Sequence, residues 1–248
     1  MIIVCKEWVQ SVYQNNLNID KIISIAITES RGITNTFRLG FLLRKENIEI
    51  FYTLTDSFRS SIVLWLSKSK MRIGYNSQGR GFFLTTAVKF PLKKIHRYKK
   101  YLKLIEKDNI PIDQTLIYFK KEEIEWAKHE IEELGIENPV GLFPFSVSKT
   151  RTFPNGKISE WLNGSKEHFL IFGAKNDTQK ANVIINENKN IVMTSLCGKY
   201  SLRQSMILIS LCKYALAADS GLGHISSIIK VPTISFFGAN RASVTKPL

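Results

Sequence analysis

Residues 215–224, ALAADSGLGH, decide the fold of this chain. An apolar run that fits a buried strand passes into Asp219, Ser220 and Gly221, and an apolar segment with helical periodicity follows. The next strand is expected over 231–236 (VPTISF). A strand, a helix and a second strand in this order are typical of a parallel α/β sheet with right-handed crossovers.

The turn at the end of the first strand is a candidate phosphate site. At the start of the helix, Ser220 and Gly221 leave backbone N–H groups free at its positive end, outside the carboxyl end of a strand. The Asp219 carboxylate is better suited to accepting hydrogen bonds from sugar hydroxyls. In the alternative interpretation, Asp219 or Ser220 merely caps the helix and His224 packs against the sheet, and the local pattern taken alone favours that alternative.

The same alternation of apolar runs and helical segments extends over the whole chain. Strands are expected over residues 1–5, 21–27, 48–54, 71–75, 115–119, 140–144, 168–172, 190–193, 214–217 and 231–236. Helices are expected between most of them, including 121–134 and 202–213. Ser201 is a plausible N-cap for the second of these helices. We therefore expect two α/β domains, 1–115 and 116–248, with a boundary near 108–122.

Composition places the chain among globular proteins. It has 248 residues, of which 44% are hydrophobic, so wholesale disorder is excluded and a sizeable core is available. The apolar runs are far shorter than the ~20 residues of a membrane-spanning helix, and no signal sequence opens the chain. Three cysteines without metal-ligand spacing fit a reducing cytoplasm. We expect a soluble cytoplasmic protein.

Positive charge is concentrated in the first half of the chain. The whole chain has 35 Lys and Arg against 21 Asp and Glu, a net charge of +14. Residues 1–120 hold 20 basic and 9 acidic residues, whereas residues 121–248 hold 15 and 12. The dense run 89–107 is either a solvated helix face or a surface for a polyanion: nucleic acid, a phosphorylated glycolipid or an anionic membrane. Zinc-finger spacing and RNP motifs, which would favour nucleic acid, are absent from the sequence.

Two further stretches place charged residues after expected strands. The loop 144–154 (PFSVSKTRTFP) contains Lys149 and Arg151, which are suited to gripping a diphosphate. Residues 54–60 (LTDSFRS) and the turn around Arg80 suggest a site for an acidic substrate. Solvated loop charges are the commoner interpretation of each pattern alone. Neither a phosphate-binding P-loop nor histidines at metal-ligand spacings occur in the sequence.

The order and spacing of these motifs resemble the heptosyltransferases of glycosyltransferase family 9, which build the inner core of lipopolysaccharide, and are most similar to the heptosyltransferase II type. The resemblance covers nearly the whole chain. Its motifs are SFRSS (57–61), RIGY (72–75), GRGFFLT (79–85), RTFP (151–154), LIFG (170–173), LCGKYSL (196–202), ADSG (218–221) with His224, and FG (237–238). Arg151 stands where the family usually has Lys, which preserves the charge.

This resemblance implies an α/β fold of the GT-B type, with two Rossmann-like domains facing a cleft. It implies transfer of L-glycero-D-manno-heptose from ADP-heptose to a Kdo-lipid A acceptor, with inversion and without a cofactor or metal. The donor would be bound by Lys149, Arg151, Asp219, Ser220, Gly221 and His224. The acceptor would be bound by Ser57, Arg59 and Arg80. Contact with the cytoplasmic face of the inner membrane is implied as well, and a specific nucleic-acid partner is not.

The chain departs from the family pattern at its ends. Family members begin with a strand, a glycine-containing loop and a helix that carry the general base, an Asp, and this chain begins at what resembles the second strand. The catalytic base is therefore unassigned, and the C-terminal helices of the family are also expected to be missing. Two alternatives stay open: a relative that uses another nucleotide sugar, and a non-catalytic protein that binds anions or nucleic acid through its basic half.

Overall fold

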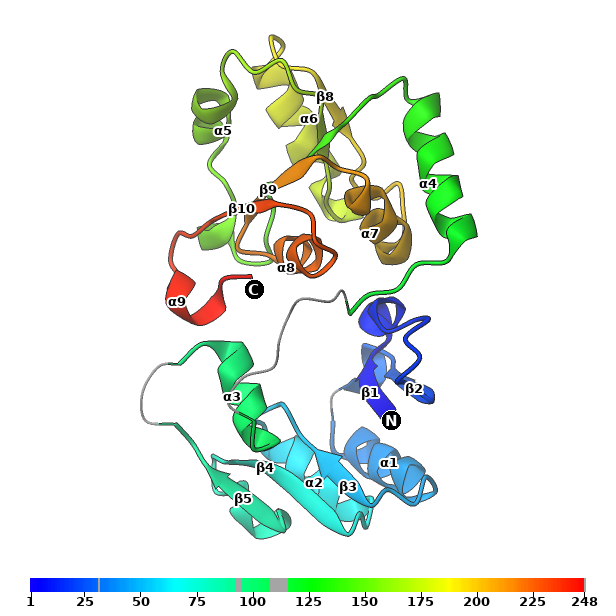
Figure 1. The fold of residues 1–248 in the computed structure, drawn as a ribbon. Coiled ribbons are helices and arrows are strands. Elements are labelled where there is room, and N and C mark those ends of the chain that lie inside the picture. The colour runs from blue at the N-terminus through cyan, green and yellow to red at the C-terminus, as the bar shows by residue number, and fades with distance from the viewer. Residues whose placement is uncertain (31, 92–94, 108–115, 248) are drawn as a thin grey trace. The chain divides into compact units, whose positions relative to one another are not determined.

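A computed structural model describes residues 1–30, 32–91, 95–107 and 116–247. The chain divides into two compact units (Figure 1). The C-terminal unit comprises Met1–Ile2, Trp8–Ile22 and Ile112–Leu248, and the N-terminal unit comprises Ile3–Glu7 and Ile23–Pro111. The expected boundary near 108–122 falls partly on residues 108–115, which lie outside the described residues.

The C-terminal unit is built on a five-stranded parallel sheet. Its strands are β6 (Val140–Phe143), β7 (Phe169–Ile171), β8 (Met193–Ser195), β9 (Tyr214–Ala218) and β10 (Thr233–Phe236), in the spatial order β10-β9-β6-β7-β8. Its helices are α4 (Lys121–Glu133), α5 (Asn155–Leu162), α6 (Thr178–Glu187), α7 (Leu202–Ser210), α8 (Gly221–Ile228) and α9 (Ala242–Thr245). Parallel strands of this kind need helical crossovers, and these cover both faces of the sheet.

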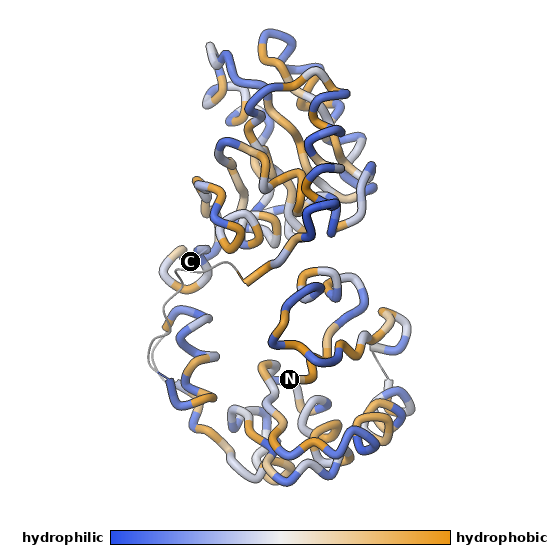
Figure 2. The backbone as a smooth tube through the Cα atoms, turned by 45° about the vertical axis from the view of Figure 1, so that its right-hand side comes forward, coloured by the Kyte–Doolittle hydropathy of each residue, from blue (hydrophilic) through white to orange (hydrophobic). Residues whose placement is uncertain are grey.

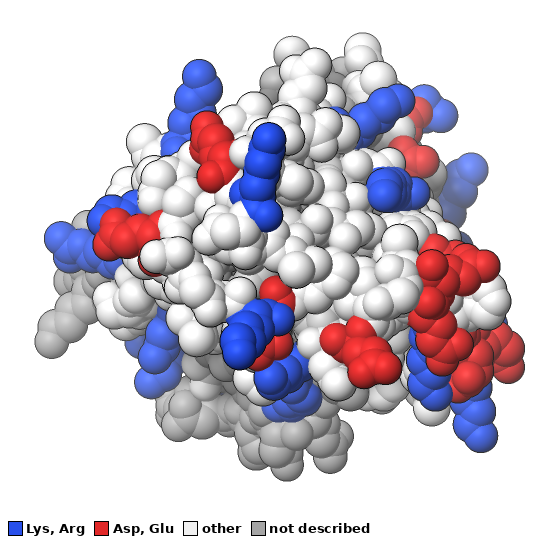
Figure 3. Space-filling view, turned by 90° about the horizontal axis from the view of Figure 1, so that it is seen from above, with Lys and Arg blue, Asp and Glu red and all other residues white. Residues whose placement is uncertain are grey.

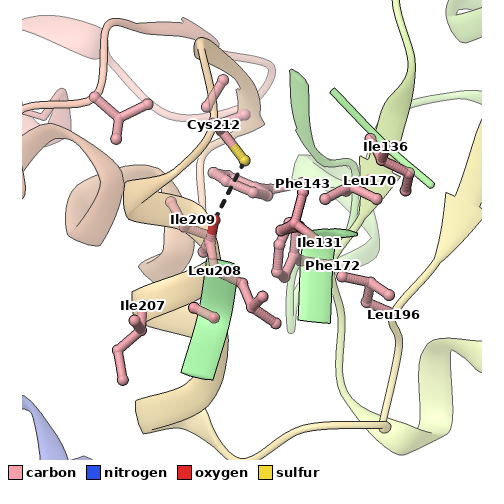
Figure 4. Close-up of a cluster of buried hydrophobic side chains, with 14 residues drawn as sticks. Ile131, Ile136, Phe143, Leu170, Phe172, Leu196, Ile207, Leu208, Ile209 and Cys212 are labelled. Carbon is pink, nitrogen blue, oxygen red and sulfur yellow. Dashed lines mark hydrogen bonds between the residues drawn. The ribbon is translucent and has the colours of Figure 1, made fainter. Parts of the chain in front are cut away.

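Alternate side chains of each strand enter two separate hydrophobic clusters. Phe143 and Leu170 lie in the cluster with α4 and α7, which Figure 4 shows around Cys212. Leu142 and Ile171, one residue away in each strand, lie in the cluster with α5 and α6. Because strand side chains point alternately to the two faces, the sheet is apolar on both sides. Figure 2 shows the corresponding hydrophobic stretches along the tube of this unit.

The N-terminal unit is smaller. Strands β3 (Ile50–Tyr52), β4 (Met71–Asn76) and β5 (Thr86–Lys89) form a parallel sheet in that order. Strands β1 (Ile2–Lys6) and β2 (Lys21–Ile25), most of whose residues belong to this unit, form a separate two-stranded sheet. Its helices are α1 (Ile33–Arg44), α2 (Phe58–Leu66) and α3 (Arg97–Leu104). Across both units, the described residues also contain five 3-10 turns: η1 (Glu7–Val12), η2 (Thr28–Ser30), η3 (Arg80–Phe83), η4 (Lys149–Arg151) and η5 (Lys175–Asp177).

Most expected elements are confirmed to within two residues at each end. Ser201 caps α7 as predicted, because its side chain accepts a hydrogen bond from the Gln204 backbone N–H. The strand expected over 190–193 lies instead at Met193–Ser195. Strand β5 was not predicted, and the helix expected over 202–213 ends at Ser210.

The strand expected over 115–119 is wrong for the residues of that range that the structure describes. Residues 116–119 belong to neither a helix nor a strand. The Tyr118 carbonyl accepts a hydrogen bond from the Arg203 guanidinium, and the Phe119 ring lies 4.8 Å from the same group. A side chain of α7 therefore takes the place of a neighbouring strand as the partner of this segment.

Candidate functional site

The order of the strands in the C-terminal unit reverses between β6 and β9. Here the chain proceeds from β6 in one direction to β7 and β8, and in the other to β9 and β10. In open parallel sheets, ligands bind outside the carboxyl ends of the strands at the point where the order reverses. The loops that leave β6 and β9 lie at this point, and they carry the residues expected to bind the donor.

Asp219, which directly follows β9, is held by both neighbouring loops. Arg151 Nη1 donates to the Asp219 carbonyl at 3.4 Å and lies 3.8 Å from Oδ2 of its carboxylate. Ser146 Oγ also donates to the Asp219 carbonyl, at 3.2 Å. Asn240, in the loop after β10, donates from Nδ2 to Asp219 Oδ2. The carboxylate is only 4% exposed, so its orientation is fixed by these contacts.

The start of α8 lies beside this carboxylate. Ser220 is the N-cap residue in an extended conformation, yet its side chain makes no capping hydrogen bond, and its buried Oγ has no hydrogen-bond partner. A Cβ added to Gly221 would meet no atom within 4 Å. The N–H groups of the first helical turn are those that an α-helix leaves without an intrahelical partner. The start of α8 therefore combines free backbone N–H groups and a buried hydroxyl without a partner with open space beside Gly221.

Lys149, Arg151 and His224 complete the set of predicted donor residues. Lys149 and Arg151 lie in η4, where Lys149 is exposed and the Arg151 side chain is 29% exposed. His224 is half-buried in the first turn of α8, and its backbone N–H donates to the Ser220 carbonyl. The structure thus brings Arg151, Asp219 and Ser220 together, with Lys149 on the neighbouring rim of the same loop.

Two residues that contact Asp219 were given no role from the sequence: Asn240 and Ser146. Asn240, which holds the Asp219 carboxylate, is 21 residues away along the chain and belongs to no motif. Gly238, which belongs to the FG motif at 237–238, lies close to the loop that carries Arg151: a Cβ there would lie 2.8 Å from the Thr150 carbonyl oxygen. Ser146 was noted in its loop but given no role. No local sequence pattern marks Asn240 as a partner of Asp219; only its place in the loop after the last strand can be recognised in the sequence.

In the N-terminal unit, the predicted acceptor residues cluster at the turn before α2. Ser57 is the N-cap of α2 and accepts from the Ser60 backbone N–H at 3.2 Å. Arg59 donates from Nε to Thr36 Oγ1 at 2.6 Å, which ties the start of α2 to α1. Both residues lie at the carboxyl end of β3, as expected from their position after that strand.

Arg80 lies beneath this turn rather than on it. Its side chain is fully buried, and it donates to the carbonyls of Tyr75, Thr55 and Ser57. Burial lowers the pKa of the guanidinium, and Asp56, whose carboxylate oxygen lies 3.9 Å from Nη2, partly opposes that effect. With no exposed surface, Arg80 has no direct contact to offer an acceptor here. It positions the backbone of residues 55–60.

Asp56 was noted in the sequence only for its place after β3. In the structure its Oδ2 accepts from Lys100 Nζ at 2.6 Å, and the Lys100 ammonium also lies 4.3 Å from the centre of the Phe90 ring. Asp56 is thus part of an ion-pair network with Lys100 and Arg80. We assign no general base among the described residues.

Within the described ranges, no three His, Cys, Asp or Glu side chains are grouped so that they could hold a metal ion. No helix in that part of the chain is long and apolar enough to cross a membrane.

Comparison with known proteins shows which family the sequence matches. Residues 36–248 match the family model described as glycosyltransferase family 9 (heptosyltransferase). Lipopolysaccharide heptosyltransferase 2 of Salmonella typhimurium is 24% identical over 229 residues, which cover 85% of this chain and 66% of the relative. Lipooligosaccharide heptosyltransferase 2 of Campylobacter jejuni is 26% identical over 230 residues, covering 85% and 65%. The chain therefore spans just under two thirds of the length of these curated relatives.

Solved structures show the same fold. ADP-heptose lps heptosyltransferase II of E. coli superimposes with a TM-score of 0.79 at 20% identity, over 100% of this chain and 78% of that one. A family 9 glycosyltransferase of Veillonella parvula gives a TM-score of 0.83 at 19% identity, over 99% and 74%. The expected α/β fold of the GT-B type, with parallel sheets, is confirmed by these matches.

Proposed function

This chain belongs to glycosyltransferase family 9, and on that premise we propose that it transfers heptose from ADP-heptose to the inner core of lipopolysaccharide. The observation that carries the proposal is the cluster of Arg151, Asp219 and Ser220 where the order of the strands reverses. A buried carboxylate beside a helix N-terminus and a loop arginine offers separate partners for the hydroxyls of a sugar and for a diphosphate.

Each donor residue has a role in this proposal. Asp219 accepts hydrogen bonds from heptose hydroxyls. Ser220 and Gly221 donate backbone N–H groups to the diphosphate, and the Ser220 hydroxyl, which has no partner in the structure, gains one from the ligand. Arg151 and Lys149 stabilise the negative charge that develops on the leaving ADP, and His224 holds the first turn of α8.

On the acceptor side we propose that Ser57 and Arg59 contact an anionic glycolipid, a Kdo-lipid A precursor. Arg80 acts through the turn that carries them. Transfer is a single displacement with inversion at the anomeric carbon, and the protein works in the cytoplasm. The N-terminal unit has 18 Lys and Arg against 7 Asp and Glu, and this excess attracts a polyanionic acceptor.

A thermal-shift titration with ADP, ADP-heptose and a uridine-linked sugar tests the proposal. A ligand at about 100 times its Kd stabilises a folded site by roughly 2.7 kcal/mol, so a specific shift with ADP-heptose is expected. Asp219→Asn and Arg151→Ala should each weaken binding by at least roughly tenfold, because each removes a charged hydrogen-bonding partner. Lys189→Ala, an exposed lysine at the opposite end of the sheet, is the matched control and should leave binding unchanged.

The competing functions give other results. A family relative with another donor would shift with the uridine-linked sugar and not with ADP-heptose. A non-catalytic anion-binding protein would bind RNA with a steep dependence on salt, and Asp219→Asn would not affect that binding. Transfer of radiolabelled heptose to a Kdo-lipid A acceptor would then test the reaction itself.

A further inference from the structure

Helix α1 carries an apolar stripe on its exposed side. Ile33, Phe37 and Phe41 follow one another at intervals of four residues, so they share one face of the helix. They are 78%, 44% and 50% exposed. The stripe is therefore separate from the buried face of α1, which packs on α2 at Gly40, where an added Cβ would lie only 2.4 Å from that of Leu66.

Helix α2 carries a second exposed group of aromatic rings. Phe58 and Trp65, two turns apart on one face, are 43% and 49% exposed. The Phe83 ring bridges them, with its centre 5.4 Å from Phe58 and 6.0 Å from Trp65. Phe82 packs on Phe83 at 5.7 Å and is itself 87% exposed. Four rings thus form one connected, solvent-facing cluster.

The two groups lie on the same side of the helix pair. Arg59 and Thr36 are bonded near the start of both helices, and Leu66 meets Gly40 further along both, so α1 and α2 run side by side in the same direction (Figure 1). When the two helices are viewed from their N-terminal ends, the apolar stripe of α1 lies clockwise from the residues of α1 that contact α2. The face of α2 that carries Phe58 and Trp65 lies counter-clockwise from the residues of α2 that contact α1. For parallel right-handed helices these two directions point to the same side. We name this surface the aromatic face: Ile33, Phe37, Phe41, Phe58, Trp65, Phe82 and Phe83.

Positive charge adjoins the aromatic face. Arg44 lies one turn beyond Phe41 on the same stripe of α1, and with Lys68 and Lys70 it lines a hollow of about 310 Å³ at the C-terminal ends of α1 and α2. These cations belong to a unit with 18 Lys and Arg against 7 Asp and Glu. An apolar surface next to such an excess of positive charge is complementary to a partner that has an apolar interior and a negatively charged surface.

We propose that the aromatic face docks on the surface of an anionic lipid bilayer. Large exposed apolar patches mark interaction sites, and aromatic side chains on a helical surface flanked by Lys and Arg are typical of proteins that lie in the headgroup region. The inference rests on the proposed function for its purpose: Phe58 of this face adjoins Ser57, the residue proposed to contact a lipid-anchored acceptor. Docking by this face places the acceptor turn at the membrane surface.

Co-sedimentation with vesicles tests the proposal. Wild-type protein is expected to bind vesicles of phosphatidylcholine with phosphatidylglycerol, and to bind pure phosphatidylcholine much more weakly. The double variant Phe37→Ser/Phe41→Ser should lower the partition coefficient by at least roughly tenfold, because two half-exposed rings no longer enter the lipid. The control Val183→Ser/Val192→Ser changes two apolar residues of the C-terminal unit that are 44% and 57% exposed, and it should bind as the wild type does.

The outcomes separate this proposal from the proposed function. ADP-heptose binding by thermal shift should be the same in wild type and both double variants, and urea denaturation of each variant shows whether its N-terminal unit remains folded. If the triple variant Phe37→Ser/Phe41→Ser/Phe82→Ser binds vesicles as the wild type does, the proposal that the aromatic face docks on the bilayer is overturned, whether or not ADP-heptose binds. If the wild type binds no vesicles but forms a dimer that the same triple variant does not form, the membrane proposal is overturned. The aromatic face then contacts a second copy of the chain. Vesicle binding lost only in the aromatic variants supports it even if ADP-heptose does not bind.

Discussion

Both units are parallel α/β structures with arginines near the carboxyl ends of their strands, but they use these arginines differently. In the C-terminal unit, Arg151 is partly exposed and contacts Asp219. Both residues lie near the start of α8, where the space beside Gly221 is open. In the N-terminal unit, Arg80 is fully buried beneath backbone carbonyls. A position after a strand therefore does not tell whether an arginine binds a ligand. What distinguishes the two arginines is the number of backbone carbonyls that already accept hydrogen bonds from the guanidinium.

Surface charge separates the units in the same way. The C-terminal unit has 17 Lys and Arg against 14 Asp and Glu, and on the face of it drawn in Figure 3 the two signs are interspersed. The N-terminal unit has 18 against 7. Charge in the C-terminal unit acts locally, through fixed contacts, whereas charge in the N-terminal unit is suited to long-range attraction.

The largest expected effect tests the structural role of Arg80. Arg80→Met should lower the free energy of unfolding by about 3–5 kcal/mol, because it leaves Asp56 without one cation and several buried carbonyls without donors. Urea denaturation measures the loss. Arg38→Met, which removes an arginine that is 72% exposed and paired with Glu29, is the control and should cost less than about 1 kcal/mol.

A small loss in Arg80→Met would break the comparison. It would mean that the carbonyls of Thr55, Ser57 and Tyr75 find other donors, and that Arg80 is free to bind an acceptor, as the sequence motif suggested. A large loss leaves Ser57 and Arg59 as the candidates for direct contact on that turn.

A smaller effect is expected at the buried arginine of the C-terminal unit. Arg203 donates from Nε and Nη2 to the two carboxylate oxygens of Glu123, at 2.8 and 2.7 Å, and from Nη1 to the Ser11 carbonyl at 3.2 Å. The hydrogen bonds from Arg203 are the main reason that the pKa of Glu123 is lowered. This contact joins the N-terminal segment around Ser11 to α4 and α7.

The direction of the shift predicts how stability depends on pH. A carboxyl whose pKa is lower in the folded state stabilises the protein above its unfolded pKa, about 4.3, and this stability is lost as the pH falls through the folded pKa. Glu123→Gln should therefore be less stable than wild type by about 2 kcal/mol at pH 7 and nearly equal to it in acid. Lys70→Met, at the exposed pair with Glu49, is the control and should leave the pH profile of unfolding nearly unchanged. Parallel pH profiles for wild type and Glu123→Gln would show that the pair adds no stability.

The sequence predicted what depends on local pattern. The buried strands of the C-terminal unit were found because apolar runs bounded by turns are strong signals, and β9 with its Asp219 turn was placed correctly. Strand β5 was missed because Thr86–Lys89 is short and alternates weakly. The segment around Tyr118 looked like a strand, since its β-forming residues are the same whether the partner is a strand or the Arg203 side chain.

The candidate site could be predicted only in part. Asp219, Ser220 and Arg151 belong to motifs with a recognisable place after strands. Asn240 could not be found, because its contact with Asp219 depends on how the loop after β10 folds back, which no local pattern encodes. The burial of Arg80 was equally hidden, since exposed and buried arginines look alike in a sequence.

The smallest expected effect sharpens the comparison, because function in the C-terminal unit rests on backbone geometry as well as charge. A Cβ at Gly238 would lie 2.8 Å from the Thr150 carbonyl oxygen, so Gly238→Ala must displace the loop that carries Arg151 and should cost about 1 kcal/mol of stability. At Gly221 an added Cβ meets no atom within 4 Å, so Gly221→Ala should not lower stability and, because Ala is the better helix former, should raise it by up to about 1 kcal/mol. Its methyl group nevertheless enters the space proposed for the diphosphate, and ADP-heptose binding should weaken by roughly tenfold. Thermal melts with and without ADP-heptose measure both quantities. Equal binding by Gly221→Ala and wild type would place the diphosphate away from the start of α8, because a ligand held by the N–H groups of that turn leaves no room for the methyl group.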